Sequence, residues 1–248
     1  MSARRVLRSG GLFFDGIDDY VKIEPFTVYG WKEITIAEWI YPCWPKANSF
    51  WSKSSMIGDM WVDYPSTFFT TDNRTDYTAL GVSWTTRRAD GTKGSYDYSI
   101  YAYRNSWVHV VRRFTSAREY SLWINGSKVA SWIIPSTEKT VLEWNPDTAT
   151  YPDRYKRFVL GANSRLDEWM KCMYDEVRIY NRALSDGEIK AVYERDEIIK
   201  DGLVLYLDFS EYEGSTAYDK SGMGNHGTIY GGARWVVKKS SRVLPSAR

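Results

Sequence analysis

Short runs of hydrophobic and β-branched residues, separated by glycine, proline, asparagine and aspartate, fill most of the chain from Leu12 to about Tyr180. The runs have the length of strands, and the breaks between them have turn composition. This spacing predicts strands over residues 12–14, 20–23, 34–41, 80–84, 99–103, 107–114, 120–124, 128–132, 158–160 and 173–180. Such a pattern is typical of an all-β sandwich or barrel.

One helix is expected to interrupt the strands. Residues 185–188 read Ser-Asp-Gly-Glu, the spacing of a capping box in which serine and glutamate cap the first turn. Hydrophobic residues then recur at helical spacing, with a buried stripe of Ile189, Val192, Tyr193 and Ile198. The helix is expected to end near Lys200, with Gly202 as the stop.

Local signals also define a hairpin and a C-terminal strand. Asn125-Gly126 lies between two β-rich runs, and this pair favours a type I′ turn because both central residues need a positive φ. A new strand is expected from Leu203 to Phe209, followed by an ordered loop over 210–232 and a last strand over 235–237. Because sandwiches of this length commonly form one unit, we expect a single domain.

The composition narrows the classes of function. The hydrophobic fraction of 43% is enough for a sizeable core, and 33 basic against 31 acidic residues leave a net charge of +2. This charge gives no broad field for nucleic acid or anionic lipid. No run approaches the roughly 18 apolar residues of a membrane span. The basic start MSARRVLRSGG has no apolar run behind it, so we expect a soluble chain without a secretory signal.

Aromatic residues make up 16% of the chain, and glutamine is absent. Aromatic residues favour strands and supply flat binding surfaces. The loss of thermolabile amides, with arginine more frequent than lysine, indicates growth at high temperature. Cys43 and Cys172 are too few for a disulfide-rich scaffold or a zinc site, and a single disulfide between them is left open.

Several motifs together resemble the laminin-G-like family of concanavalin A-type jelly rolls. They are Leu12–Val21 (LFFDGIDDYV), Trp107–Val110 (WVHV), Trp123–Gly126 (WING), Tyr174–Ser185 (YDEVRIYNRALS), Gly202–Phe209 (GLVLYLDF), Asp219–Gly222 (DKSG) and Gly224–Gly227 (GNHG). The resemblance covers most of the chain, and the combination is far more specific than any single motif. It implies a jelly-roll sandwich of two antiparallel sheets with one short helix.

The order of these motifs departs from that of the family. Residues 202–237 resemble its opening strand and Asp-x-Ser-Gly loop, which normally precede the motif that starts at Leu12. The chain therefore resembles a circularly permuted domain over residues 1–248. If the C-terminal segment folds back, the sandwich closes within one chain; if it reaches a neighbouring copy, subunits assemble by strand addition. We favour closure within one chain because closed folds leave no free sheet edges.

No group of residues predicts catalysis. Glucanases of this fold type carry carboxylates in a Glu-x-Asp-x-x-Glu run, which this sequence lacks. Asp175 and Glu176 are neighbours on a predicted strand and point to opposite faces, which is wrong for a pair that shares one glycosidic bond. His109 and His226 are expected to be hydrogen-bonded structural residues. We therefore assign no catalytic residues and expect the protein not to be an enzyme.

One structural calcium ion is predicted at the C-terminal loop. Asp219, Asn225 and backbone carbonyl groups around Gly227 offer the hard oxygen ligands that calcium takes. The resemblance implies that Asp175 lies near this loop. The alternative is an Asx-turn, in which Asp219 only accepts hydrogen bonds from backbone N–H groups. The acidic turn of residues 15–19 is a weaker second candidate.

Carbohydrate binding is predicted from aromatic residues in loops. The segment from Ile133 to Arg157 is longer than the fold needs, and loops of this length are often functional. Flat rings beside polar groups fit the faces of sugars, so the candidate carbohydrate-binding residues are Trp144, Tyr151, Tyr155 and Asp147. Trp44, Trp51 and Trp61 are further candidates for the same surface. The alternative is that these rings fill the core or a subunit contact.

The sequence thus predicts a non-catalytic recognition or assembly module that binds a glycan or glycoprotein, with calcium as a structural ion. The alternative is a structural protein of a virion or filament that assembles by strand exchange through its C-terminal strand. The rearranged strand order, the thermophile composition and the absence of a signal peptide favour this alternative, and a glycan-cleaving hydrolase is a remote third. The fold favours a virion or extracellular location.

Overall fold

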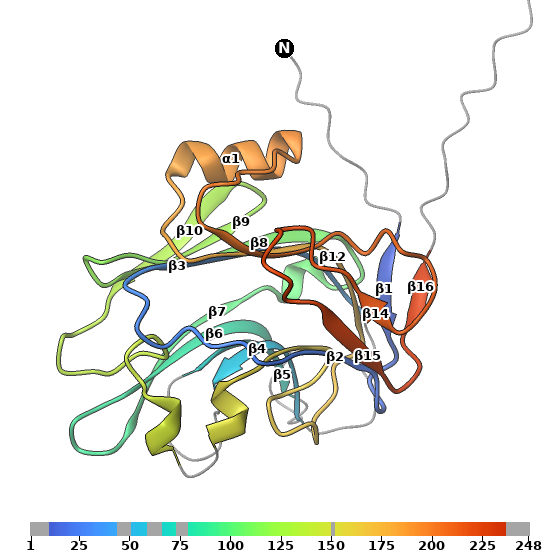
Figure 1. The fold of residues 1–248 in the computed structure, drawn as a ribbon. Coiled ribbons are helices and arrows are strands. Elements are labelled where there is room, and N and C mark those ends of the chain that lie inside the picture. Colours follow the sequence, from blue (N-terminus) through green and yellow to red (C-terminus); the bar gives the residue numbers. More distant parts are fainter. Residues whose placement is uncertain (1–9, 44–50, 59–65, 73–78, 150–151, 237–248) are drawn as a thin grey trace, which may run out of the picture.

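The computed structural model describes residues 10–43, 51–58, 66–72, 79–149 and 152–236 of the 248-residue chain. Within these residues, two antiparallel sheets of eight strands each pack face to face (Figure 1). The prediction of an all-β, two-sheet antiparallel sandwich with one helix is therefore confirmed.

The first sheet contains, in spatial order, β10 (Ser127–Ile133), β9 (Glu119–Ile124), β8 (Val108–Phe114), β3 (Ile34–Pro42), β12 (Cys172–Tyr180), β1 (Gly11–Phe14) and β16 (Arg234–Val236), with β13 (Leu203–Leu207) also paired to β12. The second sheet contains, in spatial order, β14 (Thr216–Ala217), β15 (Gly227–Tyr230), β2 (Tyr20–Ile23), β11 (Phe158–Leu160), β4 (Trp51–Gly58), β5 (Ser66–Asp72), β6 (Ala79–Arg87) and β7 (Lys93–Ser99). Strands distant in sequence are neighbours in both sheets.

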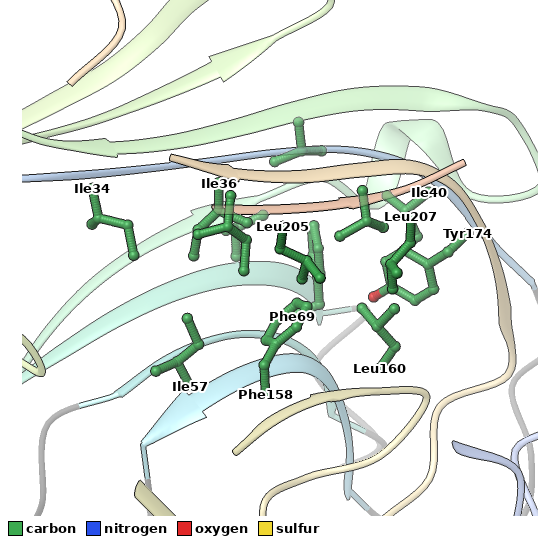
Figure 2. Packing of buried hydrophobic residues seen from close by; sticks show 14 of the residues in the cluster. Ile34, Ile36, Ile40, Ile57, Phe69, Phe158, Leu160, Tyr174, Leu205 and Leu207 are labelled. Atoms are coloured by element: carbon green, nitrogen blue, oxygen red, sulfur yellow. The ribbon is translucent and has the colours of Figure 1, made fainter. Parts of the chain in front are cut away.

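The hydrophobic core lies between the two sheets. Because successive side chains of a strand point to opposite faces, each strand sends alternate residues into this layer. Figure 2 shows Ile34 and Ile36 of the first sheet above Ile57, Phe69 and Phe158 of the second, and all five are buried. The two sheets are thus held together mainly by burial of aliphatic and aromatic surface.

The helix α1 (Asp186–Arg195) lies on the outer face of the first sheet (Figure 1). The predicted capping box is present, since the Ser185 side chain accepts from Glu188 N–H and the Glu188 carboxylate accepts from Ser185 N–H at 2.7 Å. The predicted end near Lys200 is wrong. Asp196 has a left-handed conformation with φ 54°, and its carboxylate accepts from Arg178 at 2.8 Å. This left-handed residue follows the last helical residue, Arg195, so the helix ends five residues before Lys200.

Strand prediction failed where the sequence is mostly polar. The strands β4, β5 and β7 were not predicted, and the strand predicted over 99–103 is a 3₁₀ turn, η1 (Tyr101–Tyr103). The loop predicted over 210–232 contains β14 and β15. Many of these strands read as serine, threonine, glycine and aspartate, and their pairing in the sheet rather than their local pattern makes them strands.

The C-terminal segment pairs within the chain. Strand β12 carries two strands on one edge: β1 along its first half, with Leu12 opposite Tyr174, and β13 along its second half, with Leu207 opposite Val177. Gly11 lies opposite Val236 in the β1–β16 pair, so the first and the last strand of the sandwich are neighbours. Adjacent ends are what a circularly permuted order requires.

Both cysteines are free thiols, so no disulfide joins Cys43 to Cys172. Cys172 is buried at the start of β12, and Cys43 directly follows β3. Burial raises the pKa of Cys43 to about 11, which keeps its thiol protonated and weakly reactive at neutral pH.

Candidate functional site

A pocket of about 260 Å³ opens where β3 begins and β8 ends. We call it the loop-end pocket. Its lining comes from three connections far apart in the sequence: residues 31–32 before β3, residues 114–118 around the β8–β9 turn, and residues 140–143 after β10. The fold therefore assembles this pocket from loops at one end of the sandwich, where binding residues are commonly found.

Hydrogen bonds hold the walls of the loop-end pocket together. Gly30 N–H donates to the Leu142 carbonyl oxygen at 2.8 Å and ties the first wall to the third. Arg118, with φ 63°, directs its guanidinium to the Ile134 carbonyl oxygen at 3.1 Å and to the Glu143 carboxylate at 2.6 Å. The pocket is thus formed before any ligand arrives, which lowers the entropic cost of binding.

The floor of the loop-end pocket is apolar and its rim is polar. Phe114 and Leu142 form the floor and are 3% and 2% exposed, and the half-buried ring of Trp31 lines the pocket as well. Burial acts to raise the pKa of Glu143, but hydrogen bonds from Arg118 and from Thr140 outweigh it and hold the pKa below its usual value. Glu143 is therefore an ionised hydrogen-bond acceptor at the rim.

The predicted carbohydrate-binding residues lie beside this pocket or away from it. Trp144 follows Glu143 in the chain and is half-buried, whereas Asp147 is exposed and pairs with Lys156 at 2.6 Å. Tyr155 is 4% exposed in the short turn η3 (Pro152–Tyr155), so its ring fills space and offers no face to a sugar. Tyr151, Trp44 and Trp61 lie outside the described residues, as does the side chain of Trp51.

Sequence reasoning missed the residues that line the first wall of the loop-end pocket. Trp31 and Lys32 follow a glycine with φ 85° in the connection between β2 and β3. The Gly-Trp-Lys sequence between two strands could have indicated this surface, because aromatic and charged side chains in a turn are commonly exposed.

The geometry at Asp219 is that of an Asx-turn. Its Oδ1 accepts from the N–H groups of Tyr206 and Ser221, both at 2.9 Å, and its Oδ2 accepts from Asn225 N–H at 2.9 Å and Ser221 Oγ at 2.8 Å. A carboxylate has about four lone-pair sites, and donors fill all of them here. N–H groups directed at this carboxylate would also repel a cation, so the Asp219 loop does not fit calcium.

The other predicted calcium ligands are engaged elsewhere. The Asn225 side-chain amide donates to the Val204 carbonyl oxygen at 2.7 Å, and Gly227 is a buried residue of β15 that pairs with Ile23. Asp175 is buried on β12, opposite Trp39 of β3. These residues support the strand arrangement, and the calcium ligand set read from the sequence stays a prediction that the geometry does not favour.

The acidic turn (Asp15, Asp18 and Asp19) is a different group of carboxylates. Within the described residues its three side chains each place a possible ligand atom within 4.8 Å of the others. Asp15 Oδ1 accepts from Ile17 N–H and Asp19 Oδ2 from Asp15 N–H, both at 2.8 Å. Burial and the neighbouring carboxylates raise the pKa of Asp19. Hard oxygen donors at this spacing fit calcium better than the Asp219 loop does.

Both histidines have structural surroundings. His226 Nδ1 accepts from Asp219 N–H at 3.0 Å, and its ring meets Tyr218 edge to face at 5.4 Å. His109 is 1% exposed on β8 and packs against the rings of Trp39 and Tyr193, which also stack on each other. Packing on the sheet, under the helix, accounts for the burial of His109.

The adjacent carboxylates on β12 form no catalytic pair. Glu176 has φ 52° at an irregularity in the β12–β3 pairing, and its Oε2 accepts from Arg178 and from the Tyr206 hydroxyl group, both at 2.6 Å. This cross-strand network links β12 to β13 on the outer face of the first sheet. The network fixes β13, the strand that resembles the family's opening strand, to β12.

The structure is a jelly-roll domain with a surface pocket made by its loops. A family model described as the concanavalin A-like lectin/glucanases superfamily matches residues 15–190. The chain belongs to this superfamily, and the predicted resemblance is confirmed. No curated protein matches the chain.

Solved structures share the fold at low sequence identity. A Bacteroides ovatus protein described as carbohydrate-binding has a TM-score of 0.59 at 15% identity, over 90% of this chain and 59% of its own. The receptor-binding domain of botulinum neurotoxin C/D mosaic serotype has 0.53 at 16% identity, over 77% and 43%. A heptameric SAP-like pentraxin from Limulus polyphemus has 0.55 at 11% identity, over 94% and 96%.

These identities show a common fold alone. The chain spans 59% of the length of the Bacteroides protein and 43% of the toxin domain. Among the described residues, no helix is long and apolar enough to cross a membrane.

Proposed function

We propose that this protein is a non-catalytic carbohydrate-recognition domain that binds a glycan in the loop-end pocket. The observation that carries the proposal is the lining of that pocket, with an apolar floor, the ring of Trp31 and a polar rim. Sugars present an apolar face of C–H groups and an edge of hydroxyl groups, and this lining complements both. A site of apolar walls with a few convergent polar groups is the common form of a ligand pocket.

The structural neighbours support the proposal. The Bacteroides ovatus neighbour is described as carbohydrate-binding, and a botulinum neurotoxin serotype D domain was solved with N-acetylneuraminic acid, with a TM-score of 0.53 at 16% identity. A glycan or glycoprotein partner follows from this proposal, and an extracellular or virion location stays a prediction.

Trp31→Ala is expected to weaken binding on a glycan array about tenfold or more while the protein stays folded. The loss of the stacking ring removes contact area from the ligand, and half-buried loop positions contribute less to stability than core positions do. Trp107→Ala is the matched control, because this half-buried tryptophan precedes β8 at the opposite end of the sandwich.

Array binding and thermal unfolding would be measured on the same preparations. Equal binding by the Trp31→Ala variant and the unchanged protein would exclude the loop-end pocket as the site. A protein that is folded and binds no glycan on a broad array would contradict the proposed function itself.

Calcium is a separate prediction, and the two candidate sites can be told apart. We expect a chelator to lower the melting temperature, because an ion that binds only the folded state stabilises it by mass action. Asp18→Asn should abolish the chelator effect. Asp219→Ala should keep that effect while lowering stability by about 1–3 kcal/mol, since buried N–H groups lose their acceptor. An unchanged melting temperature with chelator would contradict calcium binding.

A further inference from the structure

We propose that the loop-end pocket recognises the end of a glycan chain whose last sugar ring carries a carboxylate group. This inference rests on the proposed function and specifies the class of ligand. Three observations carry it: the size of the pocket, its uncompensated charge, and the hydrogen-bonding state of its hydroxyl groups.

The size limits the ligand to one ring. The pocket volume of about 260 Å³ lies below the roughly 300–1,000 Å³ of pockets that hold drug-sized ligands. The buried residues Phe114 and Leu142 close its floor. A glycan chain therefore cannot thread through the pocket, and a terminal ring, which leaves the pocket through a single linkage, fits this shape best.

The charge of the lining favours an acid. Arg118 and Glu143 compensate each other at 2.6 Å. Lys32 is exposed at the rim and makes no ion pair with a described carboxylate, so it is the uncompensated charge of the lining. A carboxylate on the ligand would supply the missing partner of Lys32.

The hydroxyl groups of the lining orient the ring. Ser116 Oγ donates to Glu33 Oε1 at 2.7 Å, and Thr140 Oγ1 donates to Glu143 Oε2 at 3.1 Å. Each hydroxyl proton is thus used inside the protein, and the oxygens are left as acceptors. Together with Glu143, they suit sugar hydroxyl groups and repel a carboxylate, so the carboxylate of the ligand lies at Lys32 and its hydroxyl groups face Ser116 and Glu143.

The test compares matched sugars that differ in the acid group alone. D-glucuronate would be titrated against D-glucose, and D-galacturonate against D-galactose, by isothermal calorimetry at low salt. We expect each uronate to bind about threefold to fivefold more tightly than its neutral partner, the effect of one exposed ion pair. Added salt should reduce this difference, because it screens the charge of Lys32.

Variants at the rim assign the effect to Lys32. Lys32→Ala should abolish the preference for uronates, and Lys32→Arg should keep it. Lys190→Ala is the matched control, since Lys190 is exposed on α1, outside the pocket, and its loss changes the net charge equally.

The outcomes separate this inference from the proposed function. Equal affinity for uronates and neutral sugars, or a uronate preference that survives Lys32→Ala, overturns the inference and leaves glycan binding in place. Binding of polysaccharide without binding of any single sugar overturns recognition of a chain end. Failure to bind any glycan, polymer or monosaccharide, contradicts the proposed function as well.

Discussion

Replacing Glu38 by leucine is expected to lower the free energy of unfolding by about 3–5 kcal/mol, because it leaves a charge buried and unpaired. Glu38 on β3 and Arg112 on β8 have fully buried side chains, with 2.5 Å between Oε1 and Nη2. The second sheet completes the network, since Ser55 Oγ donates to Glu38 Oε2 at 2.6 Å and Arg112 donates to the Ser55 carbonyl oxygen at 3.0 Å.

The double variant Glu38→Leu/Arg112→Met is the control for this experiment. It removes both charges at similar volume, and replacing a whole buried pair by apolar residues is often neutral or stabilising. Urea denaturation followed by circular dichroism would measure all three proteins at pH 7. A single variant that unfolds no more easily than the double variant would contradict the view that the unpaired arginine causes the loss.

A chain cut after Lys200 is expected to aggregate. The cut removes β13, β14, β15 and β16, and with them the buried residues Leu205, Leu207 and Phe209. It also exposes the second half of the β12 edge and one edge of β2. Unpaired strand edges beside exposed apolar surface are templates for aggregation. Solubility after expression and light scattering would measure the effect, and a peptide of residues 201–236 should restore the soluble fold.

The same strands decide between closure in one chain and exchange between chains. The pairing of β13 with β12 in the structure is within one chain, which predicts that no ladder of oligomers forms through this strand and that a dilute sample has the monomer mass of 28.8 kDa. Assembly by strand exchange would instead give a ladder of oligomers that grows with concentration. A truncated chain that stays monomeric and folds cooperatively would show that the C-terminal strand is dispensable.

The fold could be predicted where local signals and sheet pairing agree. The Asn125-Gly126 turn, the Ser185 capping box and the alternating strand from Leu203 each carry a local physical reason, and the structure contains all three. The strand β7 reads Lys-Gly-Ser-Tyr-Asp-Tyr-Ser and has no β-branched residue. It is a strand because β6 pairs with it along its length, which no local pattern shows.

The candidate site was harder to predict, because it depends on which loops meet. The carboxylate of Asp219 was predicted to bind calcium, yet it accepts hydrogen bonds from four donors in the folded loop. These hydrogen bonds depend on the loop conformation and cannot be read from the sequence. The segment that ends at Glu143 was identified from its length and aromatic content. Its partners Trp31 and Arg118 come from connections that are adjacent only in the folded chain.

The central claim is that the loop-end pocket binds a sugar, and an NMR titration tests it most directly. D-glucuronate would be added to ¹⁵N-labelled protein, with the indole N–H signal of Trp31 assigned through Trp31→Phe. Binding in the loop-end pocket predicts saturable shifts for that indole and for the backbone amides of Lys32, Ser116 and Glu143, while the amides of the acidic turn stay in place. Shifts confined to the acidic turn or to the outer face of the first sheet, with the Trp31 indole unmoved, would contradict it.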